Sequence, residues 1–362
     1  MNVSDVTKTI DPQAFLSRLV EATSAKGVRD VLAILPIVGE RDYTYDHSQP
    51  EHGWVEGRLH WYPVGGDRGN GGRIKHAGSP ENPIAERTVN AFEAMIELHR
   101  QLELKTNPDL PPPASPREAV KRYFDLPQLD DLPGWSQPIR GRKALDYARD
   151  IARLSRVRLI RRTQPVEYTV LVEDDGIGQS PERVHTSILS LGASDKPDKP
   201  YLIGVFGQGG SSAFAASEYS WILSRRDPRI LGGLSDGIGW TIIKRIFPIA
   251  RRDDYWVYLA AHPDGRVPML PGSAAPNVNL EHGTRIAHVN YNFGKTEPAR
   301  TLYQSLNHLL FNPVLPYELY TKGASGPDPM WGNAYRLARL SEQKSLDKKF
   351  EPQPVGDKQD VE

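Results

Sequence analysis

The chain of 362 residues contains no cysteine. Disulfide bonds, catalysis by a thiol and the usual cysteine-based structural zinc sites are therefore excluded. The chain also lacks net charge, because its 45 basic residues are matched by 45 acidic ones. No overall electric field draws it to nucleic acid or to a membrane, so any such contact has to come from a local patch.

Long hydrophobic runs are absent as well. No stretch approaches the ~20 apolar residues that span a bilayer. The first residues, MNVSDVTKTIDPQAF, do not form a basic head followed by an apolar core. We therefore expect a soluble, non-exported protein that contacts no membrane, and the lack of cysteine fits a cytoplasmic location. A chain of this length holds one large domain or two average ones.

Helical patterns dominate the first part of the chain. Residues 12–22 have apolar side chains at helical spacing, whereas residues 61–83 read as loop. A helix is expected from Pro83, with Asn82 as its cap and one buried stripe along it. The stripe consists of Ala85, Val89, Phe92 and Ile96.

Proline then interrupts the pattern at residues 107–116, which read as a stiff connector. A second amphipathic helix is expected at 141–158, a strand at 166–174 and a short helix at 180–191.

Strand patterns dominate the later part, and four are expected at 219–225, 240–249, 255–262 and 284–293. A last helix is expected at 299–311, ahead of a charged and partly disordered tail. Helices first and antiparallel-looking strands later favour an α+β fold, a two-layer sandwich with helices on one face of a mainly antiparallel sheet.

A glycine-rich segment, IGVFGQGGSSAF, precedes a helix start and would expose backbone N–H groups to an anion. A P-loop needs Lys-Ser or Lys-Thr after its last glycine, but Gly210 is followed by Ser211 and Ser212. A dinucleotide fingerprint needs G-x-G-x-x-G within a βαβ unit, and neither the order nor the surroundings fit.

This segment resembles the G-x-F-G-x-G-x-x-S-A-F box of HtpG-type chaperones, which MutL and MORC ATPases of the GHKL superfamily carry in related form. The resemblance implies the Bergerat fold, which gyrase B and histidine kinases share, and a lid that closes over the triphosphate of ATP. The implied ATP-binding residues in this box are Gly204, Gly207, Gly209, Gly210 and Ser211.

The family also carries a D-x-G-x-G box upstream, and Asp174, Gly176 and Gly178 match it at the end of the expected strand. The resemblance assigns Asp174 to the adenine amino group. A carboxylate accepts from an exocyclic amine, and glycines let the base lie against the backbone.

The third family element is a helix bearing E-x-x-x-N, and two pairs match its letters. Glu86 and Asn90 lie four residues apart within the expected helix and share one face. The other pair, Glu103 and Asn107, is disfavoured because Pro108 follows the asparagine. The resemblance implies that Glu86 is the general base and Asn90 the Mg²⁺ ligand. Glu93 stands where many relatives have aspartate.

Further positions follow from the same resemblance. Thr284 follows a glycine at the head of a late strand, as in the Gly-Thr that supports the adenine aspartate. Lys196 and Lys199 lie in the lid segment, where each is either a phosphate ligand or a solvated lysine. The ATP-binding domain would cover residues 46–312 with an insert at about 105–160. A helical lead-in (1–45) and a C-terminal extension (313–362) flank it.

The expected function is Mg²⁺-dependent ATP hydrolysis coupled to lid closure, with a homodimer or a second protein subunit engaged when ATP binds. One alternative is a histidine-kinase-like phosphotransferase, although no convincing phosphorylatable helix precedes residue 75. The other is a non-hydrolysing nucleotide- or DNA-binding module. Residues 140–162 hold nine basic residues against Asp146 and Asp150, a local charge of +7, which either grips a phosphate backbone or is a solvated face balanced by acids elsewhere.

Overall fold

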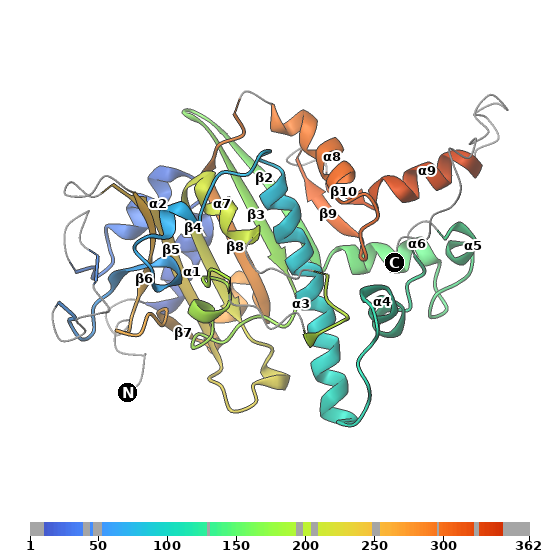
Figure 1. The fold of residues 1–362 in the computed structure, drawn as a ribbon, viewed down its shortest axis with the longest axis horizontal. Helices are drawn as coiled ribbons and strands as arrows, with labels where there is room; N and C mark the ends of the chain where they lie inside the picture. The colour runs from blue at the N-terminus through green and yellow to red at the C-terminus, as the bar shows by residue number, and fades with distance from the viewer. Residues whose placement is uncertain are drawn as a thin grey trace.

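A computed structural model describes residues 11–38, 44–45, 53–128, 131–192, 198–203, 209–247, 254–294, 297–321 and 326–342. These residues form an α+β fold around one large, mostly antiparallel sheet, as the sequence predicts (Figure 1). The strands are β1 (His60–Pro63), β2 (Ser155–Thr163), β3 (Val166–Asp174), β4 (Ser217–Arg225), β5 (Gly237–Ile246), β6 (Tyr255–Ala260), β7 (Met269–Pro271), β8 (Gly283–Tyr291), β9 (Tyr317–Tyr320) and β10 (Asp328–Met330).

The strand order across the sheet is β1-β6-β5-β4-β8-β3-β2-β9-β10, and β7 pairs with β5. Among the strand pairs of the described residues, β2 with β9 is the parallel one, and the others are antiparallel. Through β9 and β10, residues beyond 313 join the same sheet as the rest of the chain.

Helices and short 3₁₀ turns connect these strands. The α-helices are α1 (Pro12–Glu21), α2 (Ala25–Leu32), α3 (Asn82–Thr106), α4 (Pro116–Phe124), α5 (Leu132–Trp135), α6 (Ala144–Ala152), α7 (Ser212–Ala215), α8 (Pro298–Leu309) and α9 (Gly332–Glu342). The 3₁₀ turns are η2 (Val64–Gly66), η3 (Asn70–Gly72), η4 (Val184–Thr186), η6 (Gly209–Ser211), η7 (Pro228–Ile230) and η8 (Gly272–Val278).

Apolar side chains are buried against both faces of the sheet, because strand residues alternate between the faces. One face carries Trp221 and Trp240 and is covered by α1, α2 and η8. We call it the N-terminal face. The opposite face, here the α3 face, carries Val172 and Ile222 and is covered by α3 and α7. In Figure 1, α3 crosses the sheet on the viewer's side.

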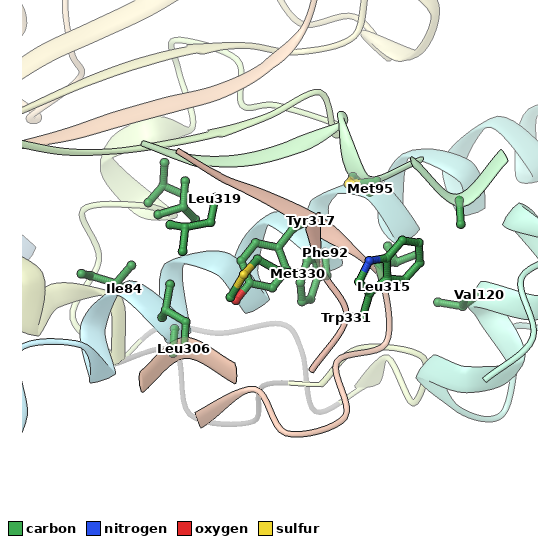
Figure 2. Packing of buried hydrophobic residues seen from close by; sticks show 14 of the residues in the cluster. Ile84, Phe92, Met95, Val120, Leu306, Leu315, Tyr317, Leu319, Met330 and Trp331 are labelled. Carbon is green, nitrogen blue, oxygen red and sulfur yellow. The ribbon is translucent and has the colours of Figure 1, made fainter. Parts of the chain in front are cut away.

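The largest core cluster lies on the α3 face and extends to the C-terminal elements. Figure 2 shows Ile84, Phe92 and Met95 of α3 among residues of α8, β9 and β10. The buried stripe predicted for this helix is therefore correct for Ala85, Phe92 and Ile96, while Val89 is half-buried.

Four local predictions need correction. The helix expected at 141–158 ends at Ala152, because Val157 and Leu159 alternate in β2 and pair with β3. The loop expected at 61–83 begins with β1, which pairs with β6. Residues 180–191 form turns and η4 rather than a regular helix. Asn82 is the first residue of α3, and its N-cap Glu81 makes no side-chain capping bond.

Candidate functional site

Helix α3 presents the two candidate residues of its E-x-x-x-N sequence on one face. Glu86 is exposed and Asn90, one turn later, is half-buried. Although solvent reaches Glu86, partial burial raises the pKa of its carboxyl above the ordinary value, against the opposing effect of the neighbouring Arg87. A raised pKa makes a carboxylate a better proton acceptor.

The competing pair does not share a helix face. Helix α3 ends at Thr106, and Asn107 follows it with φ −136° and ψ 80°. Glu103 is engaged in ion pairs with Arg100 at 2.6 Å and with Arg122 at 2.6 Å. Asn107 therefore lies beyond the end of α3, whereas Glu86 and Asn90 both lie within it.

The loop after β3 is fastened to α3 one turn beyond Asn90. The amide of Ile177 donates to the carbonyl oxygen of Ala94 at 2.9 Å. A Cβ placed on Gly176 would lie 2.6 Å from Ala94 and 2.8 Å from Oδ1 of Asp174, so only glycine fits there. The carboxyl of Asp174 is thus held beside α3.

Asp174 is buried, and burial dominates its titration. Desolvation raises the pKa of Asp174 to about 7, and the charge of Asp175 adds to this rise. Hydrogen bonds from the backbone of Gly176 and Thr284 and the charge of Arg156 lower the pKa but do not offset burial. The Gly176 amide donates to Oδ1 at 2.9 Å. A buried carboxyl beside a glycine loop can recognise a polar group of a ligand.

Two glycines let the loop approach neighbouring strands. Gly178 has φ +62°, and a Cβ there would overlap the carbonyl oxygen of Arg225 on β4. Gly283 has φ +97°, and a Cβ there would overlap the carbonyl oxygen of Asp174. Both positions combine a left-handed backbone with a close contact, which only glycine tolerates.

Thr284 pairs with Asp174 in the β3–β8 register, so the two residues predicted to cooperate are neighbours. Its hydroxyl, however, bonds to the hydroxyl of Ser224 at 2.9 Å. Ser224 also accepts from the amide of Gln179 at 2.8 Å. Thr284 therefore acts on Asp174 through its backbone, and its side chain helps to hold the loop that follows Gly178.

The end of the glycine-rich segment packs against the first turns of α3. Turn η6 contains Gly209, Gly210 and Ser211. A Cβ on Gly210 would lie 2.7 Å from Nη1 of Arg87. The other predicted residues of this segment, Gly204 and Gly207, and the lid residue Lys196 lie outside the described residues.

The chain just before the glycine-rich segment is held by two acids of α3. Glu93 is buried and accepts from the amide of Ile203 at 2.8 Å. Glu97 accepts from the hydroxyl of Tyr201 at 2.9 Å and from Nζ of Lys199 at 3.1 Å. Lys199 is therefore placed in an ion pair with α3, and Glu93 has the role of fastening this segment.

Asp175 pairs with the basic segment 140–162 through Arg156. Asp175 forms a bidentate pair with Arg156 at 2.8 and 2.9 Å. Six of the nine basic residues in 140–162 have an acidic partner in the structure: Arg140, Arg142, Arg149, Arg153, Arg156 and Arg158. These pairs favour the interpretation of a solvated face balanced by acids over that of a DNA grip.

Neither the described residues nor comparisons with known proteins indicate another kind of site. Within the described ranges, no helix is long and apolar enough to cross a bilayer. The same residues contain no group of three or more His, Asp or Glu side chains that could hold a metal ion. Neither a scan against protein-family models nor a search of curated proteins found a match to this chain.

Three residues of this region were not predicted from the sequence: Arg87, Ser224 and His282. Nδ1 of His282 lies 2.8 Å from the carbonyl oxygen of Gly176 and donates to it in the tautomer that carries the proton on Nδ1. Its position two residues before Thr284 was the available signal. Arg87 follows Glu86 directly, but its burial at 6% exposure depends on packing that the sequence does not reveal.

Proposed function

We propose that this protein binds ATP with Mg²⁺ and hydrolyses it, as a GHKL-type ATPase with a two-layer Bergerat sandwich formed by the sheet and the helices of its α3 face. Helices α1 and α2 would then be an addition on the N-terminal face. Lid closure would couple the nucleotide to a partner, either a second copy or another subunit.

One observation carries the proposal: α3 bears the E-x-x-x-N pair and contacts both the loop of the aspartate box and the end of the glycine-rich segment. It bears Glu86 and Asn90, its Ala94 carbonyl holds the Asp174 loop, and its Arg87 lies against Gly210. These elements span more than 120 positions, from residue 86 to residue 211. Random acidic turns and glycine clusters would not be expected to meet on one helix.

Asp174 is the proposed adenine reader. Its carboxyl is buried, accepts from the Gly176 amide at 2.9 Å and lies in a glycine loop that packs closely against α3 and β4. A carboxylate accepts from an amine, and a protonated carboxyl can also donate to a ring nitrogen. With a pKa raised to about 7, both forms are populated near neutral pH.

Glu86 and Asn90 are proposed for the chemical step. An asparagine amide oxygen is a suitable ligand for Mg²⁺, which usually takes one or two protein ligands and completes its shell with phosphates and water. Asn90 of α3 would supply one such ligand, so a cluster of acidic residues is not required. Mg²⁺ would neutralise charge on the phosphates. Glu86 would accept a proton from the attacking water, since its pKa is raised.

Two variants test the proposal in a phosphate-release assay with Mg-ATP. Asp174→Asn should abolish ATP binding, because an amide in this position presents donors to the adenine amine. Glu86→Ala should retain binding and lose roughly 10²–10⁴-fold in hydrolysis rate, the usual contribution of a general base. Hydrolysis by Glu86→Ala at the wild-type rate would show that the assigned base is wrong.

The matched control is Glu103→Ala, which removes the glutamate of the competing E-x-x-x-N pair. Its ion pairs with Arg100 and Arg122 serve the fold, so this variant should lose stability but keep its hydrolysis rate. Label from γ-³²P-ATP that stays on the protein, rather than appearing as phosphate, would instead favour the kinase alternative.

A further inference from the structure

Arg87 is a buried cation that forms no ion pair with any of the described residues. Its side chain is 6% exposed, and its Nε and Nη2 atoms have no hydrogen-bond partner among the described residues. Burial lowers its pKa to about 10, so it stays charged at neutral pH. A buried guanidinium without partners is costly, since the energy of removing its water is not recovered.

The surroundings of Arg87 are apolar on one side and glycine-rich on the other. Its guanidinium carbon lies 5.0 Å from the ring centroid of Phe214 on α7. Its Nη1 and Cζ would lie 2.7 and 2.9 Å from a Cβ on Gly210, so the turn η6 rests on the guanidinium. The aromatic ring orients the planar cation but supplies no negative charge.

Arg100, a second arginine of α3, shows how a buried guanidinium finds hydrogen-bond partners in this protein. Arg100 has the same 6% exposure. It donates to Glu103 at 2.6 Å and to the carbonyl oxygen of Leu110 at 2.7 Å. The Nε and Nη2 atoms of Arg87 have no such bonds among the described residues, although the two side chains are equally shielded from solvent.

We infer that Arg87 binds the phosphate chain of the nucleotide, next to the backbone of Gly210 and Ser211. The inference rests on the proposed ATP site and adds to it a residue that the resemblance does not assign. An arginine fork matches phosphate oxygens, and two parallel bonds are stronger than neutral ones. An anion that accepts from Nη2 of Arg87 beside η6 would provide a counter-charge for this guanidinium.

The test combines stability without nucleotide with affinity for two nucleotides. Arg87→Met keeps the length and the packing on Phe214 but removes the charge. Its melting temperature without ligand should be equal to or higher than that of the wild type, because an uncompensated charge is gone. Arg100→Met, the matched control, should melt at a lower temperature, because it removes the ion pair with Glu103 and the hydrogen bond to the Leu110 carbonyl oxygen.

Titration calorimetry with Mg-ATP and with AMP then distinguishes contacts to the phosphate chain from contacts to the base. Arg87→Met should bind ATP at least roughly tenfold more weakly, the effect of losing charge-assisted bonds. Its affinity for AMP should stay within about twofold of the wild type, and Arg100→Met should leave the ATP-to-AMP affinity ratio unchanged. If Arg87→Met does not fold, Arg87→Lys replaces it and should lower ATP affinity selectively.

Two results would overturn the inference about Arg87 but not the proposed function. One is wild-type affinity of Arg87→Met for ATP, and the other is an equal loss of affinity for ATP and AMP. A melting temperature of Arg87→Met below that of Arg100→Met would also overturn it, since it would assign Arg87 to the fold. A wild-type chain that binds neither nucleotide would instead overturn the proposed function itself, so the two failures are distinguishable.

Discussion

Two adjacent acids, Asp174 and Asp175, have opposite environments. Asp174 ends β3 on the side of α3 and is buried, whereas Asp175 pairs with Arg156 and is partly exposed. The alternation of side chains along a strand separates neighbours in this way. Burial therefore raises the pKa of Asp174 to about 7.

The raised pKa of Asp174 predicts that the free energy of unfolding depends on pH. Its folded pKa of about 7 exceeds the ordinary value of 3.8, so the folded state binds more protons between these values. The contribution of Asp174 to stability is present below pH 3.8 and is lost as pH rises towards 7. Between pH 5 and 8 the loss should be about 3 kcal/mol, from 1.36 kcal/mol per pKa unit.

Urea unfolding of the wild type and Asp174→Asn at pH 5 and pH 8 measures this effect. The difference in free energy of unfolding, wild type minus Asp174→Asn, should be smaller at pH 8 than at pH 5. Asp175→Asn is the control: it loses the pair with Arg156 and should be less stable than the wild type, but it retains Asp174 and should keep most of this pH dependence. Parallel pH profiles for the wild type and Asp174→Asn would contradict the prediction.

Gly178 gives a second prediction at the scale of single residues. Gly178→Ala should destabilise the fold by more than about 2 kcal/mol, because alanine would add both backbone strain and a steric clash of its Cβ. The backbone has φ +62°, and the new Cβ would overlap the Arg225 carbonyl oxygen. Gly233→Ala is the control, with φ +87° and open space around it, and should cost roughly 1–2 kcal/mol. Equal losses of unfolding free energy in urea would refute the packing argument.

At the scale of elements, α3 organises the site because segments from distant parts of the chain attach to it. Its backbone carbonyl at Ala94 holds the loop after β3, and its Glu93 and Glu97 hold residues 199–203. A helix is suited to this role, since residues three or four apart share one face.

Glu93→Ala should release the start of the glycine-rich segment from α3. Glu93 accepts from the Ile203 amide at 2.8 Å, so the variant should exchange that amide proton at least roughly tenfold faster. Hydrogen-exchange mass spectrometry or NMR measures the rate. Glu97→Ala removes side-chain bonds to Tyr201, Lys199 and Gln101 but none to Ile203, and should affect Ile203 less. An unchanged Ile203 rate in Glu93→Ala would show that this bond does not restrain the segment.

At the scale of the whole molecule, the sheet is stabilised from both faces. The N-terminal face buries Trp221 and Trp240 under α1 and α2. Phe15 of α1 lies 4.5 Å from Trp240, measured between ring centroids, and Trp221 donates to the Ala22 carbonyl oxygen at 3.1 Å. The first helices are therefore part of the main core.

Phe15→Ala tests this coupling. Phe15 is 2% exposed, and truncation should lower the free energy of unfolding by about 3–5 kcal/mol, the usual loss for a buried aromatic residue. Leu337→Ala on α9 is the control, because Leu337 is 57% exposed and should change stability by less than about 0.5 kcal/mol. Chemical denaturation compares them. A small loss for Phe15→Ala would mean that α1 is not coupled to the sheet.

Most elements were predictable where one periodicity continued over many residues. α3, β3, β4, β8 and α8 have the expected type and nearly the expected bounds. The prediction failed at residues 153–158, where the basic residues of β2 continue the composition of α6. Strand pairing with β3 decided this segment, and such pairing depends on distant residues.

The sequence alone determined the α+β class, the Glu86–Asn90 face, and the order of the aspartate and glycine boxes, because these depend on spacing within short segments. Only the tertiary structure decided that Glu93 fastens Ile203, that Asp175 faces Arg156, and that Nε and Nη2 of Arg87 are buried with no hydrogen-bond partner among the described residues. Burial and pairing arise from contacts between residues far apart in the chain, and a local pattern carries no record of them.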